Sequence, residues 1–140
     1  MRPPFFAVIS LFLLAAPAAA EAPPADHRET LAALAEVLGQ SHALRQACAG
    51  PDDQYWRARM MRLMEVERPQ GDWKAELTGA FNAGYTSRRR LFPVCTPASR
   101  RAEMTAAARG RGLAGKLTQG ARGDSAAVVP DAMAPDAPSR

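Results

Sequence analysis

The chain has 140 residues, with 18 Lys and Arg against 14 Asp and Glu, 12 Pro, 10 Gly, two His and two Cys. A chain of this length holds at most one small domain, which excludes a dinucleotide-binding enzyme, a TIM barrel, a kinase and any multidomain assembly. So few histidines and cysteines also exclude most metal sites that need several of these ligands.

An export signal is predicted at the N-terminus, over residues 1–20. Arg2 supplies a positive charge, an apolar run interrupted only by Ser10 covers residues 5–16, and Pro17 precedes three alanines that end at Ala20. This is the pattern of a cleaved signal peptide. A membrane anchor would need about 20 apolar residues, and this run is shorter. We therefore expect cleavage near Ala20, a periplasmic location and no transmembrane span in the mature chain.

The first predicted helix spans about residues 27–48. Asp26 and Glu29 have the spacing of a capping box, and leucines recur on one face of the segment. The helix should end at Gly50, because Pro51 cannot continue it.

Three further helices follow in the sequence. The second is expected after Asp53, a good N-cap type, and should end near Glu67. The third begins after Asp72, and its end stays open because Pro93 must either end it or kink it. The fourth begins with Thr96 as a hydroxyl cap, followed by proline at the first helical position.

The two cysteines are expected to form one disulfide. Cys48 and Cys95 both remain in the mature chain, and an even number of cysteines in an oxidising compartment favours pairing. They lie 47 positions apart, which differs from the local C-x-x-C spacing of redox-active dithiols. The disulfide should therefore be structural, joining the end of the first helix to the junction of the third and fourth.

The fold class that follows is all-α, because no strand alternation occurs. We expect a small bundle of about four helices at residues 26–118, stapled by one disulfide and preceded by a linker at residues 21–25. From residue 119 to residue 140 the chain consists mainly of Gly, Ala, Asp, Pro and Ser, with almost nothing to bury. This composition predicts a disordered C-terminal tail.

Basic residues gather in the second half of the chain. Residues 86–123 hold nine basic side chains and one acidic one, Glu103. Such a density can attract an anionic envelope surface, although an ordinary solvated helix face is the alternative. Nucleic acid is not expected, because no aromatic residues interleave the arginines. The candidate contacts to an anionic surface are Arg88, Arg89, Arg90, Arg100 and Arg101.

Catalytic and metal-binding patterns are missing from the sequence. His27 and His42 lie about four helical turns apart, and no nucleophile elbow, zinc helix motif or phosphate loop occurs. Met60, Met61 and Met64 could suit Cu(I), but such a stripe is more typical of a hydrophobic core. We expect no catalytic residue, no cofactor and no metal.

Three short motifs carry a resemblance to a known family. They read W-R-x-x-M from Trp56, F-N-x-G-Y from Phe81 and C-T-P-A from Cys95. In this order they resemble an uncharacterised family of small secreted alphaproteobacterial proteins, a domain of unknown function with two well-separated cysteines. The resemblance covers about residues 31–105 and implies export and a disulfide, without an established activity. The motif residues to which we assign a structural or binding role are Trp56, Arg57, Met60, Glu67, Phe81, Asn82, Gly84 and Tyr85.

The favoured function is a non-enzymatic periplasmic protein that binds an envelope protein or an anionic envelope surface. One alternative is a Spy-like periplasmic chaperone or stress adaptor, which the basic, helical and methionine-bearing composition would fit. Another is an enzyme or enzyme inhibitor with a cleft formed by Asn82, Tyr85 and Trp56. Arg57 and Glu67 would complete that cleft. If Asn82 is instead buried among its apolar neighbours, its amide needs hydrogen-bond partners.

Overall fold

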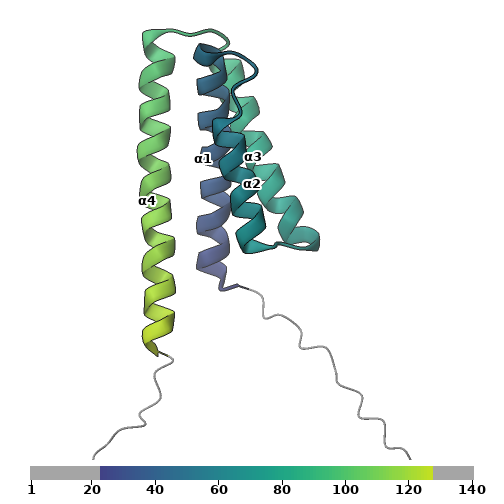
Figure 1. Cartoon of the computed structure of the whole chain (residues 1–140), viewed down its shortest axis with the longest axis vertical. Coiled ribbons are helices and arrows are strands. Elements are labelled where there is room, and N and C mark those ends of the chain that lie inside the picture. The colour runs from purple at the N-terminus through teal and green to yellow at the C-terminus, as the bar shows by residue number, and fades with distance from the viewer. Residues whose placement is uncertain (1–22, 128–140) are drawn as a thin grey trace, which may run out of the picture.

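The computed structural model describes residues 23–127, which form four helices and no strand. They are α1 (Ala25–Ala49), α2 (Tyr55–Glu67), α3 (Gly71–Leu91) and α4 (Pro97–Ala127), shown in Figure 1. The predicted all-α bundle is confirmed. Over the same residues, no helix is both long enough and apolar enough to cross a membrane. The predicted export signal lies outside the described residues.

The central element is α1, which packs against each of the other three helices. Figure 1 shows α4 along one side of α1, with α2 and α3 on the other side. Every residue from Val37 to Leu44 is buried as a result. The sequence predicted a single apolar face for this segment, but enclosure by three helices also buries the polar residues Gln40, Ser41 and His42.

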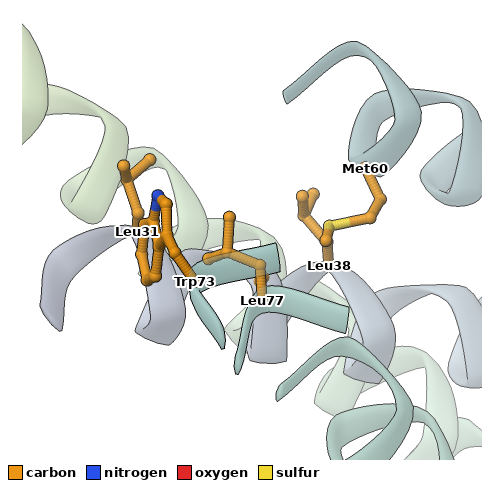
Figure 2. Packing of buried hydrophobic residues seen from close by; sticks show 6 residues of the cluster. Leu31, Leu38, Met60, Trp73 and Leu77 are labelled. Carbon is orange, nitrogen blue, oxygen red and sulfur yellow. The ribbon is translucent and has the colours of Figure 1, made fainter. Parts of the chain in front are cut away.

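Two apolar clusters hold the helices together. The larger one joins α1, α2 and α3 (Figure 2), and the smaller one joins α1 to α4. The buried members of the larger cluster are Leu31, Ala35, Leu38, Met60, Trp73 and Leu77. Those of the smaller cluster are Val37, Leu44 and Ala106. Both clusters share α1, so each of the other helices is stabilised mainly through its contact with that helix.

The backbones of α1 and α3 meet at two glycines. A β-carbon added to Gly39 would overlap the carbonyl oxygen of Phe81 on α3. A β-carbon added to Gly84 would overlap the carbonyl oxygen of Glu36 on α1. The clash in each case is with backbone, which cannot move aside as a flexible side chain can. The small-residue spacing of Ala80 and Gly84 indicates such close packing.

The helix ends follow local chemistry in most places. Thr96 caps α4 as predicted, since its Oγ1 accepts a hydrogen bond from the Ser99 amide at 3.1 Å. Ser99 Oγ in turn accepts one from the Thr96 amide at 2.8 Å. The end of α3, left open by the sequence, falls at Leu91, because Phe92 precedes Pro93 and adopts an extended φ of −133°.

The capping box predicted at the start of α1 is wrong. The helix begins at Ala25, so Asp26 lies inside its first turn, and no side chain caps the N-terminus. The carbonyl of Pro24 accepts the first helical hydrogen bond, from the amide of Arg28 at 3.0 Å. At its new position Asp26 places a negative charge near the helix N-terminus, which the helix dipole favours.

Helix α4 extends past residue 118, where the sequence predicts the end of the helical domain, and continues to Ala127. Leu113 and Leu117 are half-buried against α1, whereas residues 118–123 are all exposed. Extending an existing helix adds one hydrogen bond per residue fixed, so the glycines in this stretch do not stop it. Residues 128–140 of the predicted tail lie outside the described residues.

Cys48 and Cys95 form the predicted disulfide, with their Cα atoms 4.5 Å apart. It joins the last turn of α1 to the loop that connects α3 and α4. Cys95 is exposed and Cys48 is half-buried, with its sulfur 3.7 Å from Ser99 Oγ. The disulfide therefore holds the α3–α4 loop against the C-terminal end of the central helix.

The glycine contact predicts a large effect from one methyl group. Gly84→Ala should lower the free energy of unfolding by about 3 kcal/mol, because overpacking against backbone has no rotamer that relieves it. Gly79→Ala, in the same helix but with no atom near the added carbon, should raise stability by up to about 1 kcal/mol. Urea unfolding followed by circular dichroism measures both. Equal midpoints for the two variants would contradict the close approach.

The disulfide should contribute about 4 kcal/mol to stability, the chain-entropy value for a loop of this length. Cys48→Ala and Cys95→Ala should each lower the free energy of unfolding by this amount, and the double variant should be as stable as either single variant. Intact mass of the oxidised chain checks the bond directly, since pairing removes two hydrogens. Two free thiols, or a double variant much less stable than the singles, would refute the role.

Candidate functional site

The loop between α3 and α4 exposes two large apolar side chains at one end of the bundle. Leu91 is 65% exposed and Val94 is 62% exposed. Between them Phe92 turns inward and packs against the α1–α4 cluster, and Cys95 is bonded to α1. The loop is thus fixed from inside while its apolar side chains face outward.

Arginines surround these apolar side chains. Arg89 and Arg90 precede the loop, Arg100 and Arg101 follow it, and all four are exposed, whereas Arg88 is half-buried. None of them forms an ion pair with a described residue. No Asp or Glu occurs from residue 77 to residue 102. We call residues 88–101 the basic end, a segment with five arginines, no acidic residue and an apolar centre.

The helix dipole explains the arginines at the end of α3 but not those at the start of α4. Arg88, Arg89 and Arg90 lie in the last turn of α3, where the helix dipole favours cations. Arg100 and Arg101 lie near the N-terminus of α4, where the dipole disfavours them, and no acidic residue in the first turn compensates. Arg100 and Arg101 therefore do not stabilise α4 through its dipole.

An open groove of about 560 Å³ runs between α2 and α3. Its apolar lining is rich in methionine, and its rim carries three basic side chains and one acidic one. The apolar lining residues are Met60, Met61, Met64, Pro69 and Phe81. The charged ones are Arg57, Glu65, Arg68 and Lys74, with Gln70, Thr78 and Asn82 as polar neighbours. We call this the α2–α3 groove.

The groove contains two of the residues that the sequence assigned to a cleft. Arg57 and Asn82 both line it. Asn82 is exposed, so the alternative in which it is buried among its apolar neighbours does not hold. The reason is helical geometry: α3 turns Trp73, Leu77 and Gly84 toward α1, and Asn82 lies off that stripe.

The other members of the predicted cleft lie elsewhere, so that cleft is not formed. Trp56 lines a separate cavity between α1, α2 and α4. Tyr85 donates a hydrogen bond from its hydroxyl to Gln46 Oε1 on α1 at 3.0 Å. Glu67 lies 3.4 Å from His27 Nε2. These side chains therefore tie helices together at separate points and share no space for a substrate.

No metal centre is found in the described part of the chain. Residues 23–127 contain no group of three His, Cys, Asp or Glu side chains that could hold an ion. The three methionines of α2 differ in environment: Met60 is buried in the core, Met64 is half-buried, and Met61 is 54% exposed. Core packing accounts for Met60 as expected, whereas Met61 faces the α2–α3 groove.

The family model described as "Protein of unknown function (DUF2385)" matches residues 26–120. The chain belongs to the DUF2385 family. The resemblance to a domain of unknown function is thereby confirmed. The matched segment includes the helical bundle, both cysteines, the basic end and the α2–α3 groove. No curated protein and no solved structure matches the chain.

The sequence did not predict that His42 of this DUF2385 protein is buried. His42 is only 4% exposed, with its ring centroid 5.4 Å from that of Tyr85 and 5.9 Å from that of Phe81. Its Nδ1 is buried without a hydrogen-bond partner. Burial lowers the pKa of His42 below its usual 6.5, with a further lowering from Arg57 and an opposing effect of Asp53. The neutral ring acts as an aromatic filler between α1 and α3.

This environment makes stability depend on pH. Well above pH 6.5 His42 is neutral in both the folded and the unfolded chain, so it does not make the free energy of unfolding depend on pH there. Below that pH the unfolded chain takes up a proton that folded His42 resists, so the free energy of unfolding falls. One titrating group limits the slope from His42 to at most about 1.4 kcal/mol per pH unit, and the slope ends below the lowered pKa. Urea unfolding at a series of pH values measures it.

His42→Gln removes the titrating group and should flatten this part of the pH profile. His27→Gln, which changes the other histidine of the same helix, should keep the slope that His42 causes. If His42→Gln leaves the profile of the parent protein unchanged, His42 does not titrate at a lowered pKa in the folded chain.

Proposed function

We propose that this protein is exported and acts, without catalysis, as a peripheral protein of the cell envelope that binds an anionic phospholipid surface through its basic end. One observation carries the proposal: Leu91 and Val94 are exposed on a fixed loop that arginines flank on both sides. The N-terminal signal pattern and the cysteine pair support export to an oxidising compartment.

The energies expected for such a contact suit reversible attachment. A basic side chain near an anionic membrane surface contributes about 1 kcal/mol, and the basic end has four exposed arginines. Burying a leucine or valine side chain contributes about 1.5–3 kcal/mol. The loss of translational and rotational freedom opposes both. The balance favours a salt-sensitive attachment of the whole domain, in place of a membrane-spanning anchor.

The arrangement of the polar motif residues supports a role without catalysis. Arg57 and Asn82 line the α2–α3 groove, while Trp56, Glu67 and Tyr85 make contacts on other sides of the bundle. General acid–base chemistry needs its groups within hydrogen-bond reach of one substrate. Residues spread over three surfaces do not meet that condition.

A second candidate function is that of a periplasmic chaperone or adaptor, which the α2–α3 groove favours. Met61 is 54% exposed there, and flexible thioether side chains adapt to varied apolar partners. Arg57, Arg68 and Lys74 outnumber Glu65 on the rim, which suits an acidic amphipathic segment. Binding in this groove would depend less on salt than binding at the basic end, because its lining is mainly apolar.

Cosedimentation with vesicles tests the proposal. The oxidised chain without residues 1–20 should bind phosphatidylglycerol vesicles, bind phosphatidylcholine vesicles weakly, and lose binding as salt is raised. The double variants Leu91→Ser with Val94→Ser, and Arg100→Gln with Arg101→Gln, should each reduce binding at least tenfold.

Matched controls remove the same chemistry from other surfaces. Met61→Ser with Val66→Ser deletes two exposed apolar side chains of α2, and Arg109→Gln with Arg122→Gln deletes two exposed charges of α4. Both controls should keep most of the binding. If they lose as much as the variants at the basic end, attraction depends on net charge and composition alone, and the proposed attachment site is wrong.

A further inference from the structure

A second pocket, of about 430 Å³ and open to solvent like the α2–α3 groove, lies between α1, α2 and α4. Its size falls within the range of small-molecule sites. We call it the α4 cavity because the sequence of α4 creates it. The α4 wall consists of Ala107, Gly110 and Ala114, which recur at helical spacing on one face. The apolar residues of the other walls are Leu34, Val37, Leu38, Trp56 and Leu63.

Unpartnered polar atoms occur in the residues that line the α4 cavity. Ser41 is completely buried, and its Oγ has no hydrogen-bond partner. Trp56 also lines the cavity, and its Nε1 is likewise buried without a partner. A buried polar group without a partner costs about 1–3 kcal/mol. Both atoms are closed to a group the size of water, so the arginines and the apolar walls, and not these two atoms, indicate what the cavity binds.

Two arginines give the α4 cavity a positive charge. Arg59 of α2 and Arg111 of α4 line it, and its described lining contains no Asp or Glu. The guanidinium carbon of Arg59 lies 3.6 Å from the ring centroid of Tyr55 and 5.5 Å from that of Trp56. These aromatic contacts hold the cation beside the cavity. A guanidinium group that lacks an ion pair is suited to bind a carboxylate or a phosphate.

We propose that the α4 cavity binds a single aliphatic chain with an anionic end group. The chain would lie between the leucines of α1 and the small residues of α4, and the anion would contact Arg59 and Arg111. The apolar walls and the two cations without ion pairs together fit this amphiphile. A purely apolar ligand would leave the cations unused. The inference is independent of membrane attachment, since the cavity and the basic end share no residue.

The test uses the two tryptophans of the chain as reporters, because each gives one indole signal in a ¹H–¹⁵N spectrum. Decanoate titrated into the oxidised protein should shift the indole signal of Trp56 in a saturable way. The signal of Trp73, which is buried and does not line the α4 cavity, should stay in place. Decanol and butyrate, which lack the charge and the long chain respectively, should bind at least tenfold more weakly. Decyl phosphate shows whether the preferred end group is a carboxylate or a phosphate.

Variants separate this site from general binding to the surface. Arg59→Gln and Arg111→Gln should each weaken decanoate binding at least tenfold and leave decanol binding unchanged. Ala107→Leu should fill the cavity and abolish binding, whereas Ala108→Leu, at the next and exposed position of α4, should not. The two arginine variants keep the test valid if Ala107→Leu fails to fold.

Three results would overturn the proposal. They are an unmoved Trp56 signal with both decanoate and decyl phosphate, equal affinity for decanol and decanoate, and equal loss of binding in Ala107→Leu and Ala108→Leu when both are folded. None of these results depends on whether the basic end binds vesicles, so the failure of one proposal can be told from the failure of the other.

Discussion

The close backbone approach of α1 and α3 at Gly39 and Gly84 is the constraint on which the other features depend. Glycine has no β-carbon, so α3 can lie nearer to α1 at these positions than larger residues would allow. This closeness presses His42 against Phe81 and Tyr85 and removes its ring from water. The buried neutral histidine is therefore a consequence of the glycine contact.

The packing of all the outer helices on α1 explains why the α2–α3 groove and the α4 cavity both exist. Helices α2 and α4 pack chiefly on α1, and neither packs extensively on α3. The short helix α2 inserts Met60 into the main cluster but leaves its outer methionines beside α3, which opens the α2–α3 groove. On the other side, α4 presents alanine and glycine to α1 and leaves the α4 cavity. Central packing on one helix thus fixes the fold while the spaces between the outer helices remain unfilled.

The sequence predicted those parts of the fold that depend on local chemistry. The Thr96 cap, the helix stop at Gly50 and the disulfide need only a few neighbouring residues or a cysteine count, and the structure has all three. The predicted cleft is not formed, because predicting it correctly requires knowing which side of each helix faces α1. Asn82 lies next to core residues in sequence, yet the glycine contact turns it to the groove. Periodicity identifies an apolar stripe but does not show which partner helix covers it.

The sequence did not predict the burial of polar residues on α1, again because it does not show which helices cover each face. Gln40, Ser41 and His42 interrupt the hydrophobic pattern, and a helix read in isolation would expose them. Only the position of α1 between three helices buries them. The amide of Gln40 bonds Glu36, so its burial costs little, whereas Ser41 Oγ and His42 Nδ1 have no partner. A small domain with a limited core gains nothing in stability from such atoms, and apolar substitutes of similar size would fit. Both costs follow from the central position of α1, because the helices packed around it exclude water from these two atoms.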